Sequence, residues 1–360
     1  MTPRRPRATV LLAIFVFLLT GIVAAQDKPD RPPWAQKTKS TANSKPAPAS
    51  SPTGEPGKIV QPTPSSDPAT ASSADDAQDP AAQRGRIRVT VNLVNVLVSV
   101  LNEHNRPAPD LPREAFQLFE EGVEQKIDKF EPETLQPLDL AIMIDASLSA
   151  RKEITFEQEA AAHFIRQVLR PGDRLSVFAF DENVTQVAPF SDNVAELQSA
   201  VRRIPEGAGT SIYDAVLLGS RALERRGDDR RRVIILVTDA GETTSRADFD
   251  AARKEAVVCN ALLYTIVIRP VKSESGRNTA GEHALETMTD TTGGAMFYPD
   301  TPQELGAIFD RIDRELRTQY RLAYYPNPRG PANTYRSIVV KVTAADYKVR
   351  HRKSYLTGPQ

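Results

Sequence analysis

The distribution of hydrophobic and polar residues divides the chain into stretches of different structure. Residues 26–85 contain almost no branched or aromatic side chains and are rich in Pro, Ser, Ala and Thr. Such a stretch buries too little apolar surface to offset its ordering entropy, so we predict a disordered linker. In residues 86–133 apolar and polar positions alternate, as in RVTVNL. This alternation predicts short β-strands, two of them around a turn at Glu121 and Gly122.

Residues 134–318 show a third pattern, in which continuous apolar runs alternate with amphipathic segments. The expected strands are 138–144, 173–180, 184–190, 231–239, 261–268 and 294–299. The expected helices are 153–169, 193–204, 211–226, 247–259, 283–294 and 301–319. We expect a capping box, formed by Thr301 and Glu304, at the start of the last helix. Apolar strands that alternate with amphipathic helices predict a mostly parallel sheet covered by helices on both faces.

The chain returns to β-type patterning in residues 319–360, where the expected strands are 320–326, 335–345 and 347–356. Neither this segment nor residues 86–133 have enough strands to close a hydrophobic core alone. We therefore expect the two flanks to pack together as one small β domain. The predicted fold class is α/β, a doubly wound, mostly parallel, Rossmann-like sheet with a small β domain built from the flanking N- and C-terminal strands.

Residues 1–25 have the features of a targeting segment. The basic stretch MTPRRPR precedes an uncharged apolar run, and small residues stand before Gln26. This order is typical of a signal peptide, and the apolar run is also long enough for an uncleaved membrane anchor. In either case we expect the bulk of the chain to be exported to the periplasm, the cell envelope or the medium, with a membrane tether if the segment is retained.

Composition excludes several other classes of function. The 46 Lys and Arg residues are balanced by 46 Asp and Glu residues, so the net charge does not indicate nucleic-acid binding. Cys259 is the single cysteine, which excludes an intramolecular disulfide, and we expect its side chain to be buried. None of the four histidines stands at the carboxyl end of an expected parallel strand, and the chain has no G-x-S-x-G motif. An acyl-transfer triad is therefore not supported.

Oxygen-bearing side chains occur in three segments at the expected carboxyl edge of the sheet. Asp145, Ser147 and Ser149 follow the first parallel strand, Thr210 follows the glycines of EGAGTS, and Asp239 ends the strand RRVIILVTD. Open α/β sheets bind ligands beyond this edge. Two carboxylates and three hydroxyls without Cys or His suit a hard cation, Mg²⁺ best, with Mn²⁺ or Ca²⁺ as alternatives. Each segment alone also fits a helix cap or a turn, but their joint occurrence favours a metal site.

The order DASLS, a glycine-framed Thr and then TDAG resembles the metal-ion-dependent adhesion site of the von Willebrand factor A domain, over about residues 138–318. The flanking sequences LRTQYRLAYYP and LVNVLVSVLNEHNRPAPDLPREAFQLFEEG also resemble a bacterial exported subfamily with such domains. The resemblance implies that Ser147 and Ser149 ligate the metal directly. It implies that Asp145 and Asp239 act largely through bound water, while Thr210 joins or leaves the ligand shell with conformational state. One coordination position would remain for an acidic side chain of a partner.

Two positions depart from the family pattern. Leu148 stands where the family usually has glycine, and Ala240 precedes Gly241 where Asp-Gly is usual. The leading hypothesis is an exported, non-enzymatic protein-binding module for adhesion, envelope assembly or scaffolding, whose partner offers an Asp or Glu carboxylate. One alternative is a metal-assisted hydrolase, with Glu242 as the nearest candidate base and Glu153 as a more remote one. The other is a metal-free structural domain, for which Leu148 is the main argument.

Overall fold

The computed structural model describes residues 93–132, 135–147, 154–227, 229–268, 278–343 and 346–358. All of them lie in one folded unit, Asp79–Gln360. The expected targeting segment, the expected linker and the start of the first β segment lie outside the described residues. Within the described ranges, no helix has both the length and the apolar character that a membrane crossing requires.

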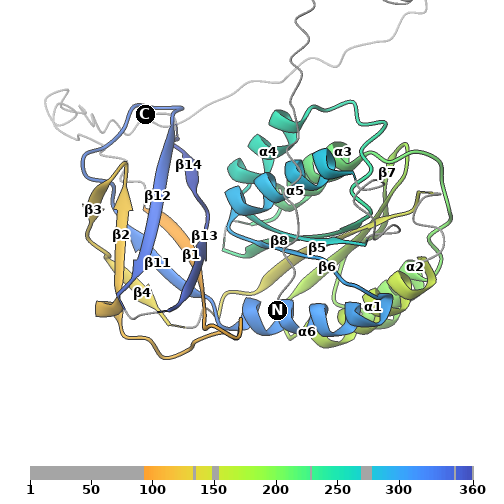
Figure 1. The fold of residues 1–360 in the computed structure, drawn as a ribbon, viewed down its shortest axis with the longest axis horizontal. Coiled ribbons are helices and arrows are strands. Elements are labelled where there is room, and N and C mark those ends of the chain that lie inside the picture. The colour runs from red at the N-terminus through yellow and green to blue at the C-terminus, as the bar shows by residue number, and fades with distance from the viewer. Residues whose placement is uncertain are drawn as a thin grey trace, which may run out of the picture. The chain divides into compact units, whose positions relative to one another are not determined.

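A six-stranded sheet forms the centre of the larger domain (Figure 1). Its strands are β5 (Leu138–Asp145), β6 (Arg174–Phe180), β7 (Val184–Ser191), β8 (Arg231–Thr238), β9 (Ala261–Val267) and β10 (Ala295–Phe297). Their order is β10-β9-β8-β5-β6-β7. Neighbouring strands are parallel except at one edge, where β7 runs antiparallel to β6. The carboxyl ends of β5 and β8, which are direct neighbours, therefore meet at the same edge of the sheet.

The central strands are buried on both faces. Every residue of β5 and of β8 is buried, as expected for a parallel sheet covered on both sides, whose strands read as continuous apolar runs. Strand β7 is at the antiparallel edge and has a mixed burial pattern. The unbroken apolar runs in the sequence thus identify the middle of the sheet.

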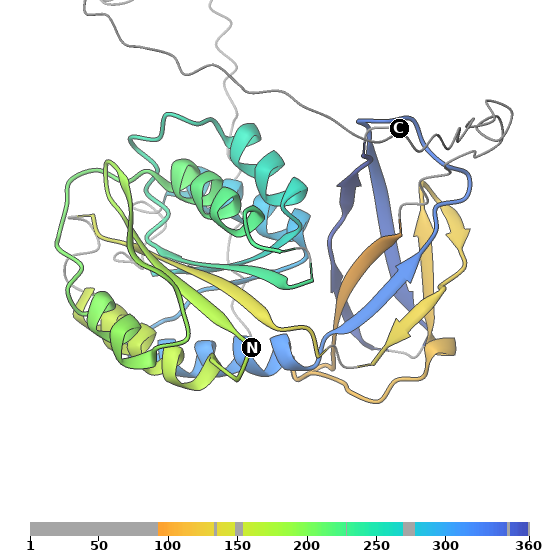
Figure 2. The same ribbon diagram turned by 180° about the vertical axis from the view of Figure 1, so that it is seen from behind.

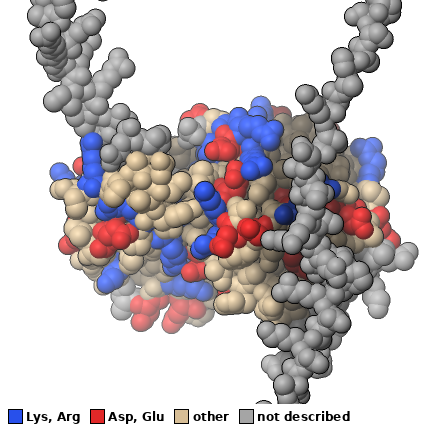
Figure 3. Space-filling view, turned by 90° about the horizontal axis from the view of Figure 1, so that it is seen from above, with Lys and Arg blue, Asp and Glu red and all other residues tan. Residues whose placement is uncertain are grey.

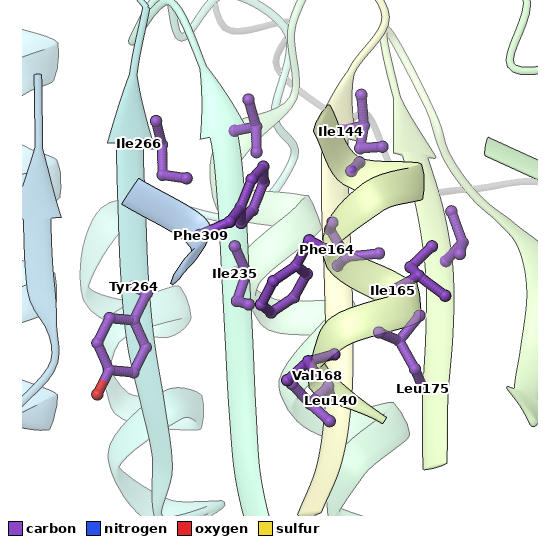
Figure 4. Close-up of a cluster of buried hydrophobic side chains, with 14 of the residues drawn as sticks. Leu140, Ile144, Phe164, Ile165, Val168, Leu175, Ile235, Tyr264, Ile266 and Phe309 are labelled. Atoms are coloured by element: carbon purple, nitrogen blue, oxygen red, sulfur yellow. The ribbon is translucent and has the colours of Figure 1, made fainter. Parts of the chain in front are cut away.

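Helices cover both faces of this sheet (Figures 1 and 2). They are α1 (Ile154–Val168), α2 (Val194–Val201), α3 (Ile212–Glu224), α4 (Phe249–Val258), α5 (Thr279–Thr292) and α6 (Leu305–Arg317). Helices α1, α2 and α6 contribute to one hydrophobic cluster, in which Phe164 and Phe309 stack with ring centroids 4.7 Å apart (Figure 4). Helices α3, α4 and α5 contribute to the cluster on the opposite face. The domain is therefore doubly wound, as predicted.

The last helix begins differently from the prediction. A 3-10 turn, η4 (Pro302–Glu304), precedes α6. The Thr301 hydroxyl donates to Glu304 Oε1 at 3.3 Å, and Glu304 Oε2 accepts from the Asp300 N–H at 3.1 Å. The Glu304 N–H donates to the Thr301 carbonyl instead of its hydroxyl. The predicted capping box is therefore wrong, because the tighter first turn uses the backbone oxygen as acceptor.

The flanking segments form a small β domain. Its strands are β1 (Val94–Leu101), β2 (Phe116–Glu120), β3 (Val123–Gln125), β4 (Lys129–Glu131), β11 (Tyr320–Tyr324), β12 (Tyr335–Val342), β13 (Lys348–His351) and β14 (Ser354–Leu356), with a 3-10 turn, η2 (Arg113–Ala115), before β2. They make two four-stranded sheets, β13-β1-β11-β4 and β14-β12-β2-β3. Each sheet combines N-terminal with C-terminal strands, and both contribute to one hydrophobic cluster. This confirms the predicted fold class, in which a β domain is built from both flanks.

The β domain contacts the larger domain near the amino ends of the parallel strands. The Lys353 N–H donates to the Thr291 carbonyl at the end of α5, at 3.0 Å. Arg352 donates to the side chain of Asn260, directly before β9, at 2.8 Å. Arg350 forms an ion pair with the buried Glu315 of α6. These contacts lie at the end of the sheet opposite to the carboxyl edge that carries the predicted metal site.

Candidate metal centre

Asp145 is the last residue of β5 and is fully buried. Its Oδ1 accepts from the Ser147 N–H at 3.0 Å. Its Oδ2 accepts from the Thr238 hydroxyl at 2.7 Å, and Thr238 is the last residue of the neighbouring strand β8. The carboxylate thus lies where the two central strands end, held by one amide and one hydroxyl.

The surroundings of Asp145 disfavour its negative charge. Burial raises the pKa of this carboxyl from 3.8 to about 6, against the lowering effect of hydrogen bonds from Ser147 and Thr238, and the charge of Asp239 raises it further. Within the described part of the chain, no Lys, Arg or His forms an ion pair with Asp145. A buried carboxylate normally has a cationic partner or a metal.

Ser147 follows β5 and is also buried. It forms an isolated parallel bridge with Gly207, whose N–H donates to the Ala146 carbonyl at 2.8 Å. A Cβ at Gly207 would lie 1.9 Å from Asp181 Oδ2, so only glycine allows this close approach. The bridge brings the glycine-rich loop before α3 next to the end of β5.

Thr210 lies in that glycine-rich loop and is 3% exposed. Its N–H donates to the Thr243 hydroxyl at 2.8 Å. Its carbonyl accepts from the N–H groups of Thr243 and Thr244, at 2.9 and 3.1 Å. The loop that follows β8 therefore binds both the N–H and the carbonyl group of Thr210.

Asp239 directly follows β8 and is partly buried. Its Oδ1 accepts from the Gly241 N–H at 2.9 Å. Ala240 between them is buried and has a φ of 67°, in the left-handed region that favours glycine and costs alanine about 1 kcal/mol or more. The unusual order Asp-Ala-Gly thus places an alanine, and not the glycine, in the strained position.

Glu242 does not have the surroundings of a general base. Its Oε2 accepts from the N–H groups of Ile212 and Tyr213, at 2.7 and 3.2 Å. The Ser245 hydroxyl and N–H donate to Oε2 and Oε1, both at 2.8 Å. The two amides bind the carboxylate to the first turn of α3, and Ser245 holds it from the loop after β8. Glu153, the more remote candidate base, lies outside the described residues.

Four of the five predicted ligands lie in segments that the structure brings together. These are Asp145, Ser147, Thr210 and Asp239, whereas Ser149 and Leu148 lie outside the described residues. Over the ranges that are described, no group of three or more His, Cys, Asp or Glu side chains is placed to hold a metal. The donor set at this edge consists of two carboxylates with hydroxyls, which is the chemistry that Mg²⁺ favours. The buried Asp145, which has no basic partner among the described residues, fits a cation.

Sequence reasoning missed two functional contacts. Thr238 donates to Asp145, and Thr243 binds the backbone of Thr210. A hydroxyl residue at the end of the apolar strand, directly before Asp239, was the available signal for the first contact. The second has no local signal, because Thr210 and Thr243 are 33 positions apart.

His351 and Cys259 lie apart from this site. His351 is buried in the β domain, where its Nε2 accepts from the Val340 N–H at 3.0 Å, and burial lowers its pKa. Cys259 is free and buried, as expected, and burial raises its pKa to about 12. On the face shown in Figure 3, acidic and basic side chains are interspersed and do not form a single basic surface.

The fold and this edge together define an α/β domain with oxygen-bearing side chains gathered where two central parallel strands end. Residues 140–242 match the family model of the von Willebrand factor type A domain, and the chain therefore contains a domain of this family. Such domains typically mediate protein–protein interaction.

Similar proteins include a cyanobacterial and a mammalian chain. An uncharacterised protein of Synechocystis is 28% identical over 50% of this chain and 42% of its own length. The mouse calcium-activated chloride channel regulator 3A-1 is 23% identical over 49% of this chain and 18% of its own length. The similarity thus spans less than half the length of these curated relatives. Among solved structures, a von Willebrand factor type A protein of Catenulispora acidiphila shares 13% identity over 76% of each chain, with a TM-score of 0.45.

Proposed function

We propose that this chain is an exported protein-binding module that holds a divalent cation, Mg²⁺ in the first place, at the carboxyl edge of its parallel sheet. Asp145, Ser147, Ser149, Thr210 and Asp239 would hold the cation. When bound, the cation supplies a positive centre that attracts a carboxylate from the partner. The single observation that carries the proposal is the fully buried Asp145 carboxylate, whose described donors are an amide and hydroxyls instead of a basic side chain.

The position of the β domain supports binding at this edge. Its contacts with Thr291, Asn260 and Glu315 are at the amino end of the sheet. The β domain and a partner at the metal site would therefore occupy opposite ends of the parallel sheet. The basic and apolar segment at residues 1–25 supports export, with or without a retained membrane tether.

The contacts of Glu242 argue against the hydrolase alternative. A general base has to reach the water or hydroxyl whose proton it removes. The Glu242 carboxylate accepts from Ile212, Tyr213 and Ser245, and moving it would expose the first turn of α3. Binding of an acidic group requires no base, and it is the function that these residues support best.

Selection of displayed peptides on the immobilised 360-residue chain tests the proposal. In Mg²⁺ we expect enriched peptides to contain Asp or Glu, and exchange of that residue for Asn or Gln should abolish binding. EDTA and the Asp239→Ala variant should each abolish binding as well. Peptides that bind equally well in EDTA, or with the amide in place of the acid, would contradict the proposed function.

A further inference from the structure

The loop after β8 and the start of α3 are joined by reciprocal hydrogen bonds. Glu242 accepts from the first N–H groups of α3. In return, Asp214 in the first turn of α3 accepts from the N–H groups of Arg246 and Ala247, at 3.0 and 2.8 Å. Each segment therefore supplies a carboxylate that accepts hydrogen bonds from backbone N–H groups of the other.

Helix α3 depends on this loop for its N-terminal cap. Its N-cap residue is Ser211, whose side chain makes no capping hydrogen bond and whose buried Oγ has no hydrogen-bond partner among the described residues. Because the first N–H groups of a helix have no acceptor within the helix, they need one from outside. Glu242 and Ser245 supply it. A carboxylate at this end also interacts favourably with the helix dipole.

This cap lies directly beside Thr210. Thr210 is bound to Thr243 and Thr244, the residues that follow Glu242, and it stands two positions before Ile212, which Glu242 holds. Asp239 is three positions before Glu242 on the same loop. Thr210 and Asp239 come from segments distant in sequence, and the contacts of Glu242 fix one segment against the other.

We propose that Glu242 is a positioning residue of the metal centre, which sets Thr210 relative to Asp239 by holding the first turn of α3 against the loop after β8. It does not touch the metal in this role. The inference rests on the proposed function, because it presupposes that the chain binds a divalent cation. Residues that orient metal ligands typically change metal affinity about 10- to 100-fold when they are replaced.

A comparison of Mg²⁺ and Ca²⁺ affinities distinguishes a positioning role of Glu242 from a general effect on stability. Mg²⁺ demands near-octahedral geometry at short distances, whereas Ca²⁺ accepts longer and more variable ones. A displaced Thr210 should therefore weaken Mg²⁺ binding more than Ca²⁺ binding. A role limited to stability would lower the melting temperature and leave the ratio of the two affinities unchanged.

The test compares Glu242→Gln with Asp248→Asn in the whole chain. Asp248 is the matched control, because its exposed side chain caps α4 by accepting from the Ala251 N–H at 2.7 Å. Mg²⁺ and Ca²⁺ affinities are measured by isothermal titration calorimetry. We expect Glu242→Gln to weaken Mg²⁺ binding about tenfold or more and Ca²⁺ binding less. Asp248→Asn should leave the ratio of affinities unchanged.

An unchanged ratio in Glu242→Gln would overturn the inference while the proposed function stands. If the parent chain binds neither cation, the proposed function fails as well. If Glu242→Gln does not fold, Ser245→Ala decides the question, because it removes one donor to Glu242 and one cap of α3 and keeps the charge. In that variant we expect the ratio to change in the same direction, and an unchanged ratio would overturn the inference.

Discussion

Buried acidic side chains have different partners at the two ends of the parallel sheet. At the amino end, Asp139 of β5 is fully buried and forms ion pairs with Arg226 and Arg230, at 3.0 and 2.7 Å. Asp173, just before β6, is paired with Arg317 at 2.6 Å. The acids at this end therefore have arginine partners from the surrounding segments.

At the carboxyl end, the same strand β5 finishes in Asp145, whose described donors are the Ser147 N–H and the Thr238 hydroxyl. Asp239 is close enough for its charge to disfavour that of Asp145. An arginine partner offsets the cost of burying a carboxylate, so removal of one member of the pair leaves an uncompensated charge, whereas a buried carboxylate without a cation carries that cost itself. The amino end thus neutralises its buried acids within the protein, whereas the proposed function assigns a bound cation to the carboxyl end.

Breaking the amino-end pairs should have the largest effect. Asp139→Ala leaves Arg226 and Arg230 without their carboxylate, and we expect a loss of about 3 to 5 kcal/mol in the free energy of unfolding. Denaturant unfolding in EDTA measures this loss. Mg²⁺ should still stabilise the variant, and a loss of that response would contradict the separation of the two ends.

Replacement of the buried acid at the carboxyl end, Asp145, should increase the stability of the metal-free protein. A pKa raised from 3.8 to about 6 means that metal-free stability is full below pH 3.8 and is lost as pH rises through 6, by about 3 kcal/mol. Asp145→Asn removes this loss, so we expect the metal-free variant to be more stable than the parent at pH 7 by up to about 3 kcal/mol. Below pH 4 the two proteins should be equally stable.

Thermal unfolding in EDTA between pH 4 and pH 7 measures this difference. The Asp145→Asn variant should also lose the stabilisation by Mg²⁺. A variant that is less stable than the metal-free parent at pH 7 would show that the Asp145 carboxylate stabilises the fold, as Asp139 does.

Addition of Mg²⁺ should offset the stability that is lost when the buried Asp145 at the carboxyl end is ionised. At 100 times its dissociation constant, a ligand that binds only the folded state adds about 2.7 kcal/mol. We expect the melting temperature to rise in Mg²⁺ relative to EDTA, and the rise to be absent in Asp239→Ala. Equal rises in both proteins would place the bound cation elsewhere in the chain.

The smallest effect concerns the Thr238 hydroxyl. Thr238→Val removes its hydrogen bond to Asp145 Oδ2, which should raise the pKa of Asp145 further and cost about 1 kcal/mol at pH 7 without metal. The pH dependence of unfolding in EDTA should show the loss of stability extending to higher pH than in the parent. An unchanged pH profile would mean that this hydroxyl does not stabilise the ionised carboxylate.

Much of the fold could be predicted from local sequence patterns. The apolar runs that became β5 and β8 indicate strands buried on both faces, and amphipathic segments indicate the helices between them. Because the carboxyl ends of parallel strands meet at one edge, the sequence also indicated that Asp145 and Asp239 lie at the same edge of the sheet. The periodicity and the order of the elements along the chain can be read from the sequence, so these conclusions do not depend on tertiary contacts.

The partners of the charged groups could not be predicted in this way. Glu242 was considered as a base, yet it caps α3, 30 residues away in sequence. Asp139 and Asp145 stand six positions apart on one strand, and nothing in that strand indicates that one is paired with arginine and the other with hydroxyls. Arg226, Arg230 and Thr238 are about 90 positions away in sequence. Only the tertiary structure therefore decides which buried acid pairs with arginine and which with a hydroxyl.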